Sequence, residues 1–208
     1  MKPKDISGDL PRHSKKKPST RRLREIKWIV LHNTDDNNPT PNGLALYDIG
    51  PNHISQTGCP SITYNELIMS DGTPYLTLYY DEIGWHCGAW NRDAIGIAMN
   101  YKSSNDKGED EFGPPEKCLK AAIERCGELC LYFCFSPSKI YGHRELPLVA
   151  TGKTCPGLQV NLDTFRTEVA KYMQIVLEEK GLYDGGIDGI FGPLSEYALT
   201  QYPRNYVL

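Results

Sequence analysis

The chain has 208 residues, a formal net charge of −3 and 24% charged residues, which together are typical of one soluble globular domain with room for a small appendage. No apolar run reaches the roughly 20 residues that a membrane-spanning helix needs, so we expect no membrane span. The first 24 residues contain charges but no apolar stretch. They do not resemble a secretory signal peptide, and we expect a protein that is cytoplasmic as synthesised.

Charge is distributed unevenly along the chain. Residues 1–27 contain ten of the 23 Lys and Arg residues but only three of the 26 Asp and Glu residues. We therefore assign residues 1–24 to a basic N-terminal arm that precedes an acidic body. Its composition favours a solvated, disordered leader. The alternative is a tether to a polyanion such as cell wall, nucleic acid or a membrane surface.

Apolar periodicity predicts both strands and helices after the arm. The run IKWIVLH (26–32) is typical of a buried central strand, and it ends at His32, where turn-forming residues begin. The segment 61–80 is expected to form two strands joined at Asp71-Gly72, a common hairpin dipeptide. The prediction is an α/β fold with a central mixed β-sheet flanked by helices and a small helical C-terminal appendage. Its remaining elements are, in order, a strand (94–101), a polar loop (103–115), a helix (115–135), a strand (138–143) and a helix (161–181).

Seven cysteines are an odd number, so complete intramolecular disulfide pairing is impossible. In a cytosolic chain, cysteine together with histidine indicates a metal or catalytic site more often than a disulfide framework. Cys126, Cys130 and Cys134 repeat every four residues on the predicted helix that also contains Cys118. This one-sided spacing among Leu and Ile favours core packing over a metal cluster.

His32, His143 and Cys155 could form a site of another kind. Two imidazoles and a thiolate suit Zn²⁺, and three protein ligands leave the fourth tetrahedral position for water, as in catalytic zinc sites. His32 lies more than a hundred residues before the other two, unlike the closely paired ligands of zinc fingers, so the fold would have to assemble the site. From spacing alone, Cys155 could equally be a small buried residue or half of a disulfide.

Four segments follow one another in an informative order. They are WIVLHNT, ITYNELIMSDGTPY, GWHCGAWNRDAIGIAMN, and YGHRELP with GKTCPG, and they extend over about residues 26–160. Together they resemble the zinc-dependent N-acetylmuramoyl-L-alanine amidases, a family that shares its fold with peptidoglycan recognition proteins and small phage endolysins. Ordered co-occurrence of the four motifs is far more specific than any one of them alone.

The resemblance implies a site for one Zn²⁺ ion, with His32, His143 and Cys155 as its ligands. It also implies catalytic roles for Tyr64 and for Lys153, which precedes Cys155 by two positions as in the endolysin branch. Zinc would activate water near neutral pH, and Lys153 would stabilise the oxyanion that forms on the substrate. Tyr64 could position the water, accept its proton or hydrogen-bond the oxyanion.

The same resemblance places His86 and Asn91 in the part of the family that lines the substrate groove. Without it, His86 could be a packed core histidine. Two positions depart from the family pattern. Some members carry a glutamate general base right after the Ile-Gly-Ile strand core, where this chain has Ala98, so a base at that position is excluded. Cys87 stands where alanine is usual, and with Cys59 it could form a redox-sensitive pair.

The C-terminal sequence YDGGIDGIFGPLSEYAL resembles the repeat motif of helical peptidoglycan-binding modules. A calcium loop starting at Asp184 is disfavoured, because Gly186 and Ser195 occupy two ligand positions. We therefore divide the chain into a basic N-terminal arm (1–24), a zinc amidase domain (25–170) and a shortened peptidoglycan-binding-like helical segment (171–208).

The expected function is zinc-dependent hydrolysis of the amide bond between N-acetylmuramic acid and L-alanine in peptidoglycan, as in a phage-type endolysin that acts on the cell wall after release. One alternative is a non-catalytic recognition module, although such members typically lose the cysteine ligand. Others are a cytoplasmic amidase that recycles wall fragments and a regulator that binds another protein. We expect peptidoglycan as the partner, no nucleic acid, and a monomer.

Overall fold

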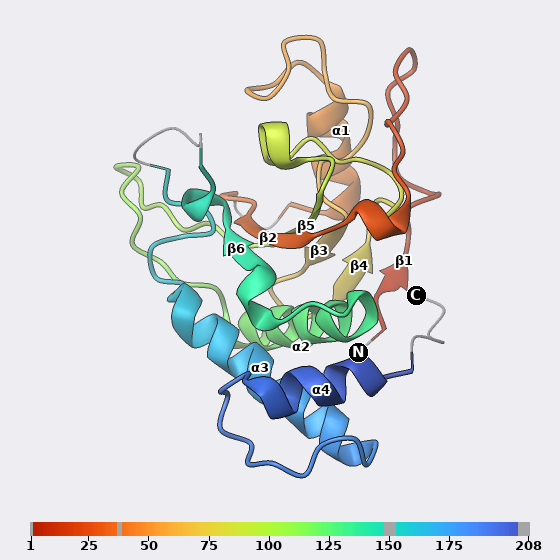
Figure 1. The fold of residues 1–208 in the computed structure, drawn as a ribbon. Coiled ribbons are helices and arrows are strands. Elements are labelled where there is room, and N and C mark those ends of the chain that lie inside the picture. The colour runs from red at the N-terminus through yellow and green to blue at the C-terminus, as the bar shows by residue number, and fades with distance from the viewer. Residues whose placement is uncertain (1, 37–38, 148–152, 204–208) are drawn as a thin grey trace.

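The computed structural model describes residues 2–36, 39–147 and 153–203. A six-stranded mixed sheet lies at its centre, in the spatial order β1-β4-β3-β5-β2-β6 (Figure 1). This architecture confirms the predicted fold class. The strands are β1 (Lys4–Asp5), β2 (Trp28–Asn33), β3 (Glu66–Ile68), β4 (Pro74–Leu76), β5 (Ala94–Met99) and β6 (Ile140–Gly142), and the α-helices are α1 (Pro41–Ile49), α2 (Glu116–Phe133), α3 (Leu162–Glu179) and α4 (Pro193–Gln201).

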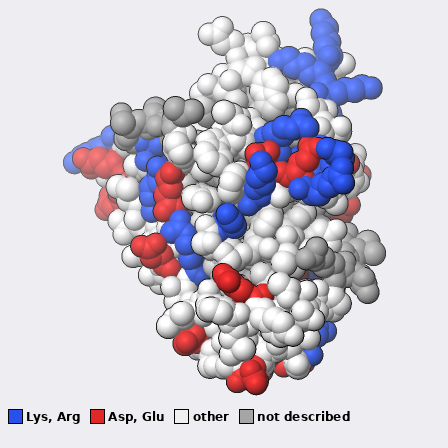
Figure 2. All heavy atoms as spheres, viewed as in Figure 1, with Lys and Arg blue, Asp and Glu red and all other residues white. Residues whose placement is uncertain are grey.

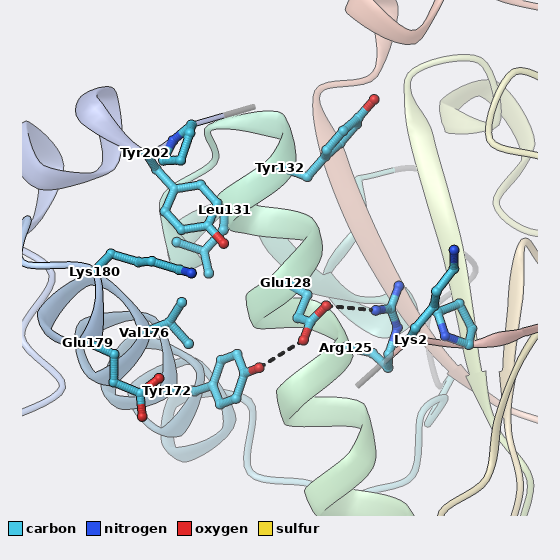
Figure 3. Close-up of a pocket in the computed structure, with 12 residues that line it drawn as sticks. Lys2, Arg125, Glu128, Leu131, Tyr132, Tyr172, Val176, Glu179, Lys180 and Tyr202 are labelled. Atoms are coloured by element: carbon cyan, nitrogen blue, oxygen red, sulfur yellow. Dashed lines mark hydrogen bonds and ion pairs between the residues drawn. The ribbon is translucent and has the colours of Figure 1, made fainter. Parts of the chain in front are cut away.

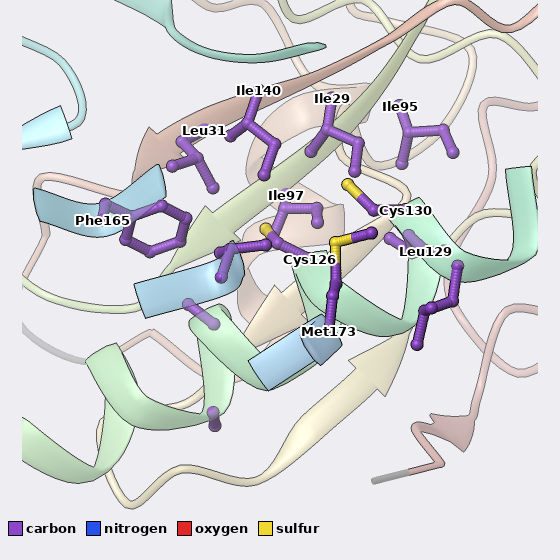
Figure 4. Packing of buried hydrophobic residues seen from close by; sticks show 14 of the residues in the cluster. Ile29, Leu31, Ile95, Ile97, Cys126, Leu129, Cys130, Ile140, Phe165 and Met173 are labelled. Atoms are coloured by element: carbon purple, nitrogen blue, oxygen red, sulfur yellow. The ribbon is translucent and has the colours of Figure 1, made fainter. Parts of the chain in front are cut away.

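The parallel pair β2 and β5 forms the middle of the sheet and is covered on both faces, so nearly all of its residues are buried. Ile29 and Leu31 of β2 point to the face on which α2 and α3 pack (Figure 4). Because side chains alternate along a strand, Val30 and His32 point to the opposite face, where α1 packs. A polar residue at the end of β2 is therefore directed towards the α1 side.

The cysteines of α2 lie where core packing predicts. Cys118, Cys126 and Cys130 are fully buried. Figure 4 shows Cys126 and Cys130 packed against the sheet. Cys134 is only partly buried and ends the helix in the left-handed conformation with a φ of 59°. All seven cysteines are free thiols. Within the described residues, no helix has the length and apolar character needed to cross a membrane.

The predicted strands and helices are present, but the strands of the hairpin are shorter than expected. β3 and β4 pair antiparallel around Asp71-Gly72, where Gly72 has a φ of +90° that favours glycine. Helix α1 was not predicted, because its sequence is rich in Pro, Asn and Gly. It begins where the Thr40 side chain accepts a hydrogen bond from the Gly43 N–H and Pro41 occupies the first turn.

The interpretation of the basic arm as a disordered leader is wrong. β1 pairs parallel with β4 and extends the sheet, and further backbone hydrogen bonds join His13 to Pro60 and Ser19 to Ile83. Arg21 is 5% exposed. Lys and Arg side chains still protrude at the end of the molecule where the arm rises beside α1 (Figures 1 and 2). The arm is thus an ordered part of the fold. Its binding to a polyanion stays a prediction.

The C-terminal segment shares its core with the sheet. Helix α3 continues through the predicted boundary at residue 170, and residues 204–208 of the predicted segment lie outside the described ranges. The buried Gln174 side chain joins α3 to the following loop. Its Nε2 donates to Tyr183 Oη, Asp188 Oδ1 and the Ile190 carbonyl, and its Oε1 accepts from the Gly189 N–H. One amide therefore joins α3 to several points of the loop and accepts the hydrogen bond of the Gly189 N–H.

Substituting Gln174→Met is expected to lower the free energy of unfolding by about 2 kcal/mol, because the loop loses its hydrogen bonds to the Gln174 amide and the Gly189 N–H loses its acceptor. Urea denaturation of the full chain would measure the loss. Gln201→Met is the matched control, since Gln201 is exposed and its amide contacts only Thr200 in the part of the chain that is described. Equal stability of the two variants would contradict a structural role for the Gln174 amide.

Candidate metal centre

His32 and His143 are brought together by strand pairing. β2 and β6 are parallel neighbours, with Leu31 opposite Gly142, so His32 on β2 and His143 directly after β6 lie at the same edge of the sheet. The two imidazole ring centroids are 4.6 Å apart. Cys155 approaches from a loop, and its Sγ lies 3.5 Å from His32 Nδ1. The ligand atoms of the three residues all lie within 4.8 Å of one another.

This donor set fits zinc. Tetrahedral zinc, with Zn–N near 2.0–2.1 Å and Zn–S near 2.3 Å, places neighbouring ligand atoms about 3.3–3.8 Å apart, which includes the observed sulfur–nitrogen distance. Burial, with His86 and His143 nearby, lowers the pKa of His32, and burial and the Lys153 charge lower the pKa of His143. Both imidazoles are therefore neutral and have lone pairs to donate. Burial raises the pKa of Cys155 to about 12, so a cation is needed to hold its thiolate.

Arg144, the neighbour of a predicted ligand, holds the loop that carries Cys155. Its backbone N–H donates to the Cys155 carbonyl, 2.9 Å away. Its guanidinium donates to the carbonyls of Thr154, Gly157 and Val160 at 3.1, 2.7 and 2.6 Å. Sequence reasoning gave Arg144 no role, although a charged residue inside the GHRELP motif could have suggested one. The thiol is thus positioned by the loop's own hydrogen bonds.

A cavity of about 470 Å³ opens above the three candidate ligands. Tyr64 and Lys153, the predicted catalytic residues, both line it. The Tyr64 ring centroid is 5.1 Å from that of His32. Burial, followed by the effect of Cys155, raises the pKa of Tyr64, so its side chain is a neutral phenol at pH 7. The remaining lining residues are Asn33, Thr34, Asp35, His53, Ile54, Trp85, His86, Cys87, Gly88, Ser103 and Thr154.

The two predicted substrate-binding residues have different positions. His86 lines the cavity but is only 7% exposed, and its Nδ1 lies 3.0 Å from His32 Nε2. Asn91 is not among the lining residues. Its Oδ1 instead accepts hydrogen bonds from the backbone N–H groups of His86 and Cys87, at 3.0 and 2.7 Å. The structure therefore shows Asn91 as a support of the His86 backbone, and its role in substrate binding stays a prediction.

The position of the missing glutamate base can now be located. Ala98 on β5 pairs with His32 on β2, and paired residues of neighbouring strands point to the same face. A buried methyl group thus lies beside the candidate ligand. Cys59 and Cys87 are both buried; the Cys59 thiol lies 3.9 Å from Asn52 Nδ2, and the Cys87 thiol lies 3.8 Å from His86 Nε2.

A second cavity, of about 410 Å³, lies between α2, α3 and the two ends of the chain (Figure 3). It contains none of the predicted site residues, and no histidine or cysteine lines it. Three of its polar side chains are engaged with one another. Arg125 Nη1 donates to Glu128 Oε2 at 3.2 Å, and Tyr172 Oη donates to Glu128 Oε1 at 3.0 Å (Figure 3). The chemistry of the described residues therefore directs attention to the first cavity.

Comparison with known families matches residues 22–158 to the family described as N-acetylmuramoyl-L-alanine amidase. Peptidoglycan-recognition protein SC1a/b of Drosophila simulans is 28% identical over 139 residues, which cover 65% of this chain and 70% of that protein. Peptidoglycan recognition protein 1 of Bos indicus is 28% identical over 137 residues, which cover 61% of this chain and 67% of that protein.

Two solved structures show the same fold at lower identity. The endolysin N-acetylmuramoyl-L-alanine amidase LysCS of Clostridium intestinale has a TM-score of 0.59 at 20% identity, over 81% of this chain and 95% of that chain. Peptidoglycan recognition protein-LE in complex with tracheal cytotoxin, a monomeric diaminopimelic acid-type peptidoglycan, has a TM-score of 0.57 at 19% identity, over 78% and 91% of the two chains. The fold is therefore common to catalytic proteins and to recognition proteins.

Proposed function

We propose, because the chain belongs to the N-acetylmuramoyl-L-alanine amidase family, that it is a zinc-dependent hydrolase of peptidoglycan. The bond cleaved is the amide between the lactyl group of N-acetylmuramic acid and L-alanine. The observation that carries this proposal is the convergence of His32, His143 and Cys155 beneath a cavity that Tyr64 and Lys153 also line. These residue types and their distances support an open catalytic zinc site with three protein ligands.

The chain's own residues have distinct tasks in this reaction. His32, His143 and Cys155 would hold one zinc ion, which supplies Lewis acidity and lowers the pKa of water to about 7 when it is bound. Tyr64, a neutral phenol beside His32, can donate a hydrogen bond to the oxyanion that develops on the amide carbonyl. The Lys153 ammonium, at the exposed side of the cavity, adds positive charge for the same oxyanion. Each such donor is typically worth about 3–4 kcal/mol.

The presence of both a metal-ligand thiol and a nearby cation favours catalysis over simple recognition of peptidoglycan. A recognition module needs a groove but neither a metal ligand thiol nor a cation beside it, and this chain has Cys155 and Lys153 within one cavity. The similarity to peptidoglycan recognition proteins keeps recognition as the second candidate. The two candidates agree on peptidoglycan as the partner.

An endolysin that acts on intact wall is favoured over an enzyme that recycles soluble fragments. The C-terminal sequence resembles peptidoglycan-binding modules, and its helix α4 leaves the apolar side chains of Leu194 and Tyr197 51% and 66% exposed. A recycling enzyme that takes small soluble substrates has no need for such a surface. Comparing turnover of intact sacculi with turnover of soluble muropeptides would separate these alternatives.

The purified, zinc-loaded protein is expected to release stem peptides from peptidoglycan with new L-alanine amino termini and no new reducing sugar ends. The reason is that amide hydrolysis leaves the glycan chain intact. Amino-group labelling and a reducing-end assay on the same digest would measure the two products. New reducing ends would identify a glycosidase and overturn the assignment, and binding of peptidoglycan without any product would favour the recognition module.

A further inference from the structure

Arg21 belongs to the basic arm and lies just outside the family match, which starts at residue 22. Its guanidinium is nevertheless buried and cationic, although burial lowers the pKa of Arg21 to about 10. Its hydrogen bonds go to backbone carbonyls of the segment 80–94, which leads into β5. Nε donates to Tyr80 at 2.8 Å, and Nη1 donates to Asn91, Arg92 and Ala94 at 2.9, 2.9 and 2.6 Å. One arm residue therefore fixes the shape of this segment.

The segment that Arg21 holds carries a residue in contact with the metal centre. The backbone carbonyl of Asn91 accepts a hydrogen bond from Arg21. The Asn91 side-chain oxygen accepts hydrogen bonds from the backbone N–H groups of His86 and Cys87. The backbone of His86 is thereby fixed, and its Nδ1 lies 3.0 Å from His32 Nε2. His32 Nδ1 is the nitrogen that faces the Cys155 thiol. If Nδ1 of His32 holds the metal, its Nε2 bears the proton and donates a hydrogen bond to His86 Nδ1.

The His86 ring is also confined from the side of the sheet. A Cβ atom at Gly96 would lie 2.9 Å from both Cγ and Cδ2 of His86. Glycine weakens the interior of a strand, so its presence in the central strand β5 calls for a close approach of another group. The His86 ring is that group. It is held in one orientation, against β5 and towards His32.

We propose that Arg21 is a positioning residue for the metal ligand His32, and that it acts through Asn91 and His86. The arm is then a component of the metal centre as well as an edge of the sheet. This inference rests on the proposed zinc site. Outer partners that orient a metal-bound imidazole typically contribute about 10- to 100-fold to metal affinity. A merely structural Arg21 would instead affect unfolding and leave zinc affinity unchanged.

The test is zinc affinity of the full chain, measured by chelator competition, together with the visible spectrum of the Co²⁺-substituted protein. Arg21→Lys retains the positive charge but removes the planar guanidinium, which donates hydrogen bonds to several backbone carbonyls. We expect about 10-fold weaker zinc binding and an altered Co²⁺ spectrum. Arg22→Ala is the matched control, because the exposed Arg22 side chain pairs with Glu25 at the surface. Its zinc affinity should equal that of the unsubstituted chain.

A double-mutant cycle tests whether Arg21 acts on the metal site through His86. His86→Gln should weaken zinc binding, and adding Arg21→Lys to it should cost less than Arg21→Lys costs alone. Additive losses, or an Arg21→Lys protein with unchanged zinc affinity and spectrum, would overturn the inference. If Arg21→Lys does not fold, Asn91→Ser tests the middle link, and unchanged zinc affinity in that variant would also overturn it. Failure of the unsubstituted chain to bind zinc would overturn the proposed function itself, which distinguishes the two failures.

Discussion

Replacing Cys155 with serine is expected to remove zinc and abolish amidase activity while the fold persists. A thiolate supplies a negative charge and a soft donor that a neutral hydroxyl cannot replace. Loss of an outer-sphere partner typically costs about 10- to 100-fold in metal affinity, so the loss of a ligand should exceed about 100-fold. The fold should persist because the loop is held through backbone carbonyls by Arg144 and not through the Cys155 side chain.

Metal analysis of the purified variant, urea denaturation and the assay for stem-peptide release measure the three outcomes together. Cys134→Ser is the matched control, since Cys134 is a free, partly buried thiol at the end of α2, and it should keep zinc and activity. Reducing agent should leave the unsubstituted protein active, because Cys155 is not half of a disulfide. A Cys155→Ser protein with full zinc and full activity would falsify the ligand assignment.

Substituting Tyr64→Phe or Lys153→Ala is expected to lower turnover by about 10²- to 10³-fold with zinc content unchanged. Both side chains line the cavity, but neither a phenol nor an ammonium is among the donors that zinc usually takes from proteins. Their hydrogen bond and charge are directed at the oxyanion, which exists only as the reaction proceeds. The losses should therefore appear in kcat and kcat/KM alike.

Steady-state kinetics on a soluble muropeptide, with zinc content determined for each preparation, would measure these effects. Tyr79→Phe is the matched control for the phenol, because Tyr79 is 44% exposed and does not line the cavity. Lys27→Ala is the matched control for Lys153→Ala, since Lys27 forms an ion pair with Asp93 at the surface. A Tyr64 or Lys153 variant with full turnover would show that its assigned role is wrong, and zinc loss would make that residue part of the metal site.

The order of the strands and helices could be predicted from the sequence, because burial on one or both faces leaves a local apolar pattern. The candidate ligands could be predicted through the resemblance to the amidase family, because spacing alone left the role of Cys155 open. His32 and His143 each follow a short apolar run, and Cys155 lies in the last of the four ordered motifs. Helix α1 escaped prediction, because its start depends on the Thr40 side chain and Pro41 and not on a strong apolar period.

The sequence by itself therefore determined the fold class and the chemical identity of the proposed metal ligands. Only the tertiary structure decided how those ligands are supported. The hydrogen bonds from Arg21 to Asn91, and between His32 and His86, join residues 70 and 54 positions apart. Such contacts leave no periodic or local signal, because they depend on how the arm and the 80–94 segment pack against the finished sheet. For the same physical reason, only the structure shows that the Asn91 side chain supports the backbone of His86.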